Sequence, residues 1–192
     1  MKTSISLAIV LLLCTLLLTA IPVAGEEGVY DHVIRLHILA NSDSQEDQGN
    51  KLAIRDEILS IYGSSLTNCT TREAAEATLL ALLPQMEKTV QEVLLSRGSC
   101  QTATVTLTEE WYPTREYDTF SLPAGNYLSL RILIGEAEGQ NWWCVMYPPM
   151  CLGVATNSET PLGLTEEEYE LVSEHRYTIK FRVLEILKSI FA

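Results

Sequence analysis

Three residues near the start of the chain carry the functional groups of a nucleophilic hydrolase. His37, Ser42 and Asp43 lie within seven residues, and an imidazole, a hydroxyl and a carboxylate act in such enzymes as base, nucleophile and orienting group. However, Ser42 stands in ANSDS rather than in a G-x-S-x-G elbow. We therefore favour the interpretation that the segment NSDS forms a turn and caps the following helix. A secreted hydrolase that uses these three residues is the alternative interpretation.

A second candidate site is the segment NWWCVMYPPMC at 141–151. Six residues separate Cys144 from Cys151, and the proline pair 148–149 restricts the loop, so the two thiols can meet if the segment doubles back. A catalytic pair is typically C-x-x-C at a helix start, so we predict a structural disulfide that contributes about 2 to 3 kcal/mol. A thiol oxidoreductase using Cys144 and Cys151 is the alternative.

The tryptophans of this segment are candidates for partner binding. Trp142 and Trp143 point to opposite faces if the segment is a strand. One of them then fills the core and the other is free to anchor an interface, although both can instead pack under loops.

Metal and nucleotide sites are not expected. The three histidines, His32, His37 and His175, have no H-E-x-x-H spacing, the cysteines form no C-x-x-C pair, and neither a P-loop nor G-x-G-x-x-G occurs. The sequence therefore predicts no cofactor.

Charge limits the kinds of partner. The 192 residues include 13 Lys and Arg against 25 Asp and Glu, which gives a net charge of −12. No segment gathers basic residues, so nucleic acid and anionic lipid headgroups are not expected as ligands. A protein partner with a basic face is expected.

The first residues predict export. Lys2 precedes the apolar run 5–18, and the small residues 23–25 precede two glutamates. We expect residues 1–25 to be a signal peptide, or an uncleaved signal anchor that would be the only direct contact with lipid. Residues 26–192 are then a single exported domain, whose four cysteines lie in an oxidising compartment.

The pattern of apolar residues predicts two helices between strands. Ser44 and Asp47 resemble a capping box for a helix that buries Ile54, Ile58, Ile61 and Tyr62. A longer helix over 70–98 should start at Thr70 with Glu73, continue through Pro84 and stop at Gly98. Strands are expected at 33–40, 101–113 and 126–135, the last one central, with 141–147 as its hairpin partner and a further strand and helix within 176–192.

These elements indicate an α+β (α/β) domain. We expect a mixed or antiparallel sheet of about four to five strands, packed against two main helices after the N-terminal signal segment.

Two blocks of this sequence resemble a known family. HVIRLHILANSDSQEDQ at 32–48 is similar to the R-x-H-x-x-A-N-S-D-S-x-x-D-Q stretch of stage II sporulation protein R from endospore-forming bacteria, and LPAG at 122–125, NWWC at 141–144 and PPMC at 148–151 are similar to its later stretches. Residues 136–138 depart from the family in being acidic.

The resemblance implies a signal between two compartments. Such a protein is exported from the forespore into the space between forespore and mother cell. There it activates a membrane-embedded aspartic protease of the mother-cell side, which processes the sigma factor E precursor. It is not an enzyme. The residues that we expect to bind this partner are Arg35, His37, Asn41, Ser42, Asp43, Asp47, Trp142 and Trp143.

Overall fold

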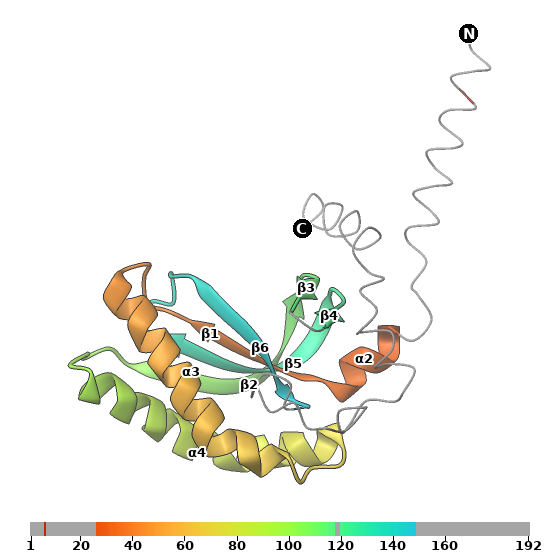
Figure 1. Ribbon diagram of the computed structural model, residues 1–192, viewed down its shortest axis with the longest axis horizontal. Coiled ribbons are helices and arrows are strands. Elements are labelled where there is room, and N and C mark those ends of the chain that lie inside the picture. Colours follow the sequence, from red (N-terminus) through yellow and green to blue (C-terminus); the bar gives the residue numbers. More distant parts are fainter. Residues whose placement is uncertain (1–5, 7–25, 118–119, 149–192) are drawn as a thin grey trace.

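The computed structural model describes residues 26–117 and 120–148, together with Ser6. In chain order the elements are α2 (Glu26–His32), β1 (Ile34–Leu39), α3 (Gln45–Leu66), α4 (Arg72–Ser96), β2 (Ala103–Tyr112), β3 (Arg115–Glu116), β4 (Ser121–Leu122), β5 (Gly125–Ile134) and β6 (Asn141–Tyr147). The strands and the two long helices that the sequence predicts within this part are all present (Figure 1).

Four strands form one mixed sheet in the order β2-β5-β1-β6. β5 is antiparallel to β2 and parallel to β1, and β1 is antiparallel to β6. β5 is therefore central, as predicted. The predicted hairpin of 126–135 with 141–147 is wrong, because β1 lies between β5 and β6. β1 is buried on both faces for five of its six residues, so it belongs in the interior of a sheet rather than at its edge.

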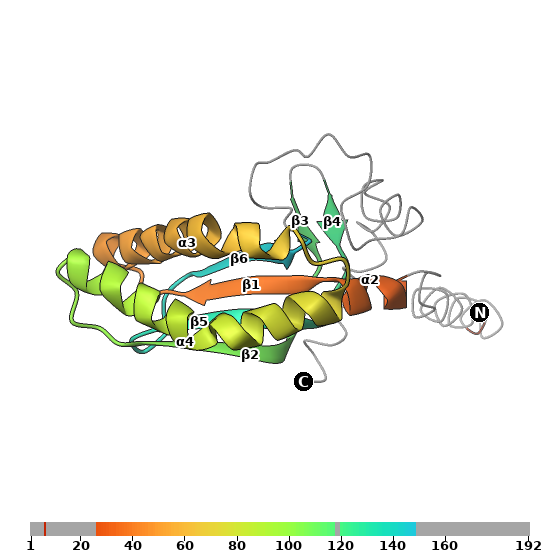
Figure 2. The same ribbon diagram turned by 90° about the horizontal axis from the view of Figure 1, so that it is seen from below.

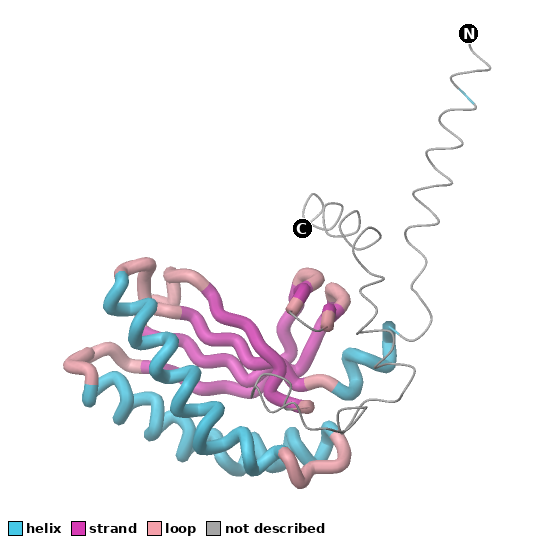
Figure 3. The backbone as a smooth tube through the Cα atoms, viewed as in Figure 1, coloured by secondary structure: helices cyan, strands magenta, loops and turns pink. Residues whose placement is uncertain are grey.

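The two long helices cover one face of the sheet, which Figures 2 and 3 show from two directions. The amide of Asp47 donates to Ser44 Oγ over 3.1 Å and so caps α3 as predicted. Ile61 is the exception on the buried face of α3, because it is 45% exposed.

α4 is a single helix through Pro84, as predicted. Its N-cap is Thr71 rather than Thr70, because the Thr71 hydroxyl accepts the amide of Ala74 over 3.2 Å. Gly98 ends the helix with a φ of 77°, a conformation that favours glycine, while Ser99 N donates to Leu94 O.

Each face of the sheet has its own apolar cluster. The helix face, which α3 and α4 cover, buries alternate residues of the strands, among them Leu36, Ile38, Leu130 and Ile132. The opposite face carries α2 and the small β3–β4 hairpin over a smaller cluster that includes Val29, Tyr112, Phe120, Tyr127 and Val145. We call this second face the hairpin face.

The α+β class, the single domain and the two main helices are thus confirmed. Within the part of the chain that the structure describes, no helix is long and apolar enough to span a membrane. The predicted export segment (Ser6 apart), Cys151 and the elements expected within 176–192 lie outside the described residues.

Candidate functional site

The polar junction between β1 and α3 is organised around Asp47. Its carboxylate accepts hydrogen bonds from Asn41 Nδ2 over 2.9 Å, from the Ser42 hydroxyl, and from Gln101 Nε2 over 2.7 Å. Burial raises the pKa of Asp47, but the hydrogen bonds outweigh it and lower the pKa to about 2. Asp47 is 6% exposed, so in this structure it holds the junction together and presents little surface.

The same junction holds the loop between β5 and β6. Asn41 Oδ1 accepts the amide of Glu136 over 3.0 Å, and Asp43 Oδ1 accepts the amide of Gln140 over 2.7 Å. Gly139 touches the junction so closely that an added Cβ would lie 2.3 Å from Ser42 O. The NSDS junction and the start of β6 are therefore neighbours, and Leu39 pairs with Asn141 in the sheet.

His37, Ser42 and Asp43 are not assembled as a catalytic triad. The Ser42 hydroxyl donates to Asp47, and Asp43 accepts a backbone amide. His37 Nδ1 lies 2.9 Å from both carboxylate oxygens of Glu110, and Nε2 lies 2.7 Å from Asn141 Oδ1. Both ring nitrogens of the candidate base are thus occupied by residues other than the candidate nucleophile, so the geometry does not favour the hydrolase alternative.

His37 belongs instead to a charged cluster on the hairpin face. Arg131 Nε lies 3.6 Å from Glu110 Oε1, on the neighbouring strand. Burial raises the pKa of Glu110, but the hydrogen bond and charge of His37 and the charge of Arg131 outweigh it, so this pKa lies below its usual value. An ionised carboxylate only accepts hydrogen bonds, so Nδ1 of His37 carries the proton.

The two tryptophans point to opposite faces, as predicted. Trp142 packs against the helix-face cluster and Trp143 against the cluster of the hairpin face. Both side chains are partly buried, which corrects the expectation of one core and one exposed tryptophan. An arginine covers each ring: the guanidinium carbon of Arg55 lies 5.1 Å from the Trp142 centroid, and that of Arg115 lies 3.5 Å from the Trp143 centroid.

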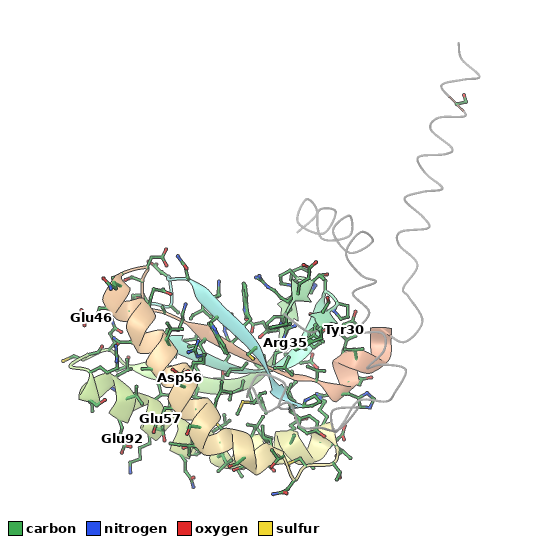
Figure 4. The ribbon with its side chains drawn as sticks, in the orientation of Figure 1. Tyr30, Arg35, Glu46, Asp56, Glu57 and Glu92 are labelled. Carbon is green, nitrogen blue, oxygen red and sulfur yellow. The ribbon has the colours of Figure 1, made fainter. Side chains whose placement is uncertain are left out.

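Arg35 is completely buried beneath the hairpin. Its guanidinium carbon lies 4.2 Å from the ring centroid of Tyr112 and 5.0 Å from that of Tyr127, and Nη2 donates to the Tyr117 hydroxyl over 2.7 Å. Figure 4 shows Arg35 near the base of the β3–β4 hairpin. The tyrosine faces stabilise the buried charge, and Arg35 holds the hairpin on the sheet.

Sequence reasoning missed Glu110, Asn141, Arg131 and Arg115. They come from three strands and a hairpin, and only strand pairing brings them to His37 and Trp143. The one available signal was the alternation of 101–113, which places Glu110 on the polar face of its strand.

The structure shows the state of two of the cysteines. Cys69 is buried and Cys100 is exposed, and both thiols are free. The Cys144–Cys151 bridge stays a prediction, since Cys151 lies outside the described residues. Among the described residues no group of three or more His, Cys, Asp or Glu side chains is arranged to hold a metal ion.

Comparison with known proteins places this chain in a family. Residues 30–157 match the profile of stage II sporulation protein R. The chain is also 36% identical to the stage II sporulation protein R of Bacillus subtilis (strain 168) over 129 residues, which are 67% of this chain and 58% of that relative. The comparison with solved structures found no match to the chain. The matched region contains both the NSDS junction and the tryptophan pair, and the chain belongs to the stage II sporulation protein R family.

Proposed function

We propose that the chain is an exported signalling protein of endospore formation. In this proposal it acts in the space between forespore and mother cell, where it activates a membrane-embedded aspartic protease that processes the mother-cell sigma factor E precursor. The observation that carries the proposal is the match over residues 30–157 to a family named for stage II of sporulation.

The geometry of the site supports a binding role rather than catalysis. The polar side chains of the NSDS junction bond to one another, to the loop 135–140 and to Gln101. In an active site we would expect a nucleophile within hydrogen-bond reach of its base, and here Ser42 and His37 each bond elsewhere. A rigid junction of this kind suits a protein ligand that must present a preformed surface.

The surface that we assign to the partner has three parts. Asp43 is exposed at the junction, and Asn141 is exposed at the start of β6. Trp143, two residues further along β6 and on the same face of the sheet, is partly exposed. Arg35, His37 and Asp47 are each at most 6% exposed and offer the partner almost no surface. His37 bonds to Asn141 and Asp47 bonds to Asn41, so these two residues support the surface from within.

Co-expression of the chain with the protease and the sigma factor precursor tests the proposal. Precursor cleavage should depend on this chain. Asp43→Ala should abolish cleavage with little change in thermal stability, because among the described residues its carboxylate accepts one hydrogen bond, from the backbone amide of Gln140. Asp56→Ala, a matched change at an exposed carboxylate of α3, should leave cleavage intact.

Export is tested separately. A chain that lacks residues 1–25 should fold and fail to signal from the cytoplasm of the forespore. Normal precursor processing in that strain would contradict the proposed compartment, and the absence of any stimulation by the full chain would contradict the proposed function.

A further inference from the structure

A lysine is buried beneath the polar junction. Lys51 lies in the second turn of α3 and is only 5% exposed. Its ammonium nitrogen, Nζ, donates to Gln48 Oε1 over 2.6 Å and to the carbonyl oxygen of Gln140 over 2.8 Å. Burial lowers the pKa of Lys51, the charge of Asp43 opposes this shift, and that of Arg55 adds to it. A lysine is rarely buried unless its ammonium is bonded, so these two hydrogen bonds fix where Nζ lies.

The two hydrogen bonds of Lys51 lead to two different segments. The first is extended by Gln48, whose Nε2 donates to the carbonyl oxygen of Ser42 over 2.9 Å, within the NSDS junction. The second goes directly to Gln140, the last residue of the loop between β5 and β6. One ammonium group thus connects the turn that follows β1 with the start of β6.

Gln140 is held at both of its backbone polar groups. Its amide donates to Asp43 Oδ1 over 2.7 Å, and its carbonyl oxygen accepts from Lys51. Asn141 follows directly and begins β6, opposite Leu39. Asp43 and Asn141 are two of the three exposed residues that we assign to the partner surface. The position of Gln140 therefore sets where Asp43 lies relative to Asn141.

We propose that Lys51 is a positioning residue for the partner surface. From beneath the junction its ammonium holds Gln140, and Gln140 keeps Asp43 and Asn141 in the arrangement that the protease binds. Lys51 itself is buried and does not touch the partner. It acts by ordering the loop before binding, so that the complex does not lose conformational entropy there on association. This inference rests on the proposed function, since it takes the activated protease as the partner.

Lys51→Met tests this role, because methionine keeps an unbranched side chain at the position and removes the hydrogen-bond donors. We expect the affinity of the full chain for the detergent-solubilised protease to fall about tenfold or more, and precursor cleavage in cells to fall with it. Lys88→Met is the matched control, because the Lys88 side chain is 78% exposed on α4. This control should change neither the affinity nor the cleavage.

Amide hydrogen exchange separates positioning from a general loss of stability. In Lys51→Met the amides of the loop 135–140, among them the Gln140 amide that Asp43 accepts, should exchange about tenfold faster or more, while those of α4 should not. Leu83→Ala is the control for stability, because Leu83 packs against the helix-face cluster and not in the junction. It should lower the melting temperature and leave the loop exchange and the affinity unchanged. If Lys51→Met does not fold, Lys51→Gln replaces it, because glutamine keeps a polar group without the charge.

The outcomes separate this inference from the proposed function. If the unmodified chain stimulates cleavage and the folded Lys51 variant binds the protease as tightly as Lys88→Met, the positioning role is wrong and the function stands. The same holds if Leu83→Ala weakens binding as much, since a loss of stability then explains the effect. If the affinity falls without faster exchange in the loop, Lys51 contacts the partner itself and the inference is overturned. If the unmodified chain stimulates no cleavage, the function fails and the inference fails with it.

Discussion

Asp47 makes the stability of this fold depend on pH. Its carboxylate accepts three side-chain hydrogen bonds that join β1, α3 and the segment before β2. The pKa of Asp47 falls from 3.8 to about 2 in the folded chain. Since one pKa unit corresponds to about 1.4 kcal/mol, this shift means that ionised Asp47 stabilises the fold by at most about 2.5 kcal/mol.

The sign of the pH effect follows from the direction of the shift. A carboxyl group whose pKa is lower in the folded state contributes its stability above the pKa of the unfolded chain, near 3.8. This contribution is lost as the pH falls through about 2. Asp47→Asn removes the charge and directs an NH₂ group toward the donors of Asn41 or Gln101. We therefore expect this substitution to lower the free energy of unfolding by about 2 kcal/mol at pH 7 and by little at pH 2.

Urea unfolding of the purified chain, followed by tryptophan fluorescence at several pH values, measures this effect. Asp56→Asn is the control, because the Asp56 side chain is 66% exposed and bonds only to Arg55 among the described residues; its free energy of unfolding should stay within about 0.5 kcal/mol. The reasoning is refuted if Asp47→Asn is as stable as the unmodified chain at pH 7, or if the difference between them is the same at pH 2.

Two further predictions follow from contacts of single residues. Gly139→Ala should lower the free energy of unfolding by about 2 kcal/mol or more, because the new Cβ would lie 2.3 Å from the backbone oxygen of Ser42. Gly49→Ala is the control, because the nearest atom there is Nη2 of the flexible Arg97 side chain, at 3.1 Å. In urea unfolding this control should be neutral or stabilising. In the folded protein a thiol reagent should label Cys100 and not Cys69, since the first is exposed and the second is buried; equal labelling rates by mass spectrometry would contradict this.

The sequence by itself determined the local elements of this protein. Ser44 caps α3 because a hydroxyl in that position reaches the amide three residues later, and Gly98 ends α4 because glycine tolerates a positive φ. The alternation along 101–113 and the apolar segment 126–135 predicted two strands, and the apolar character of the second on both faces predicted its central place. These features depend on neighbours within a few residues, which periodicity and capping patterns record.

Only the tertiary structure decided how the strands pair and therefore what the site contains. The local pattern allows β6 to pair with β5 as a hairpin. Instead β1, which is buried on both faces, lies between β5 and β6. This order pairs His37 with Trp143. Glu110 is 73 residues from His37 in the chain, and Gln101 is 54 residues from Asp47. Contacts of this kind depend on the order and register of distant strands, which are set by the burial of the whole sheet rather than by any local pattern of residues.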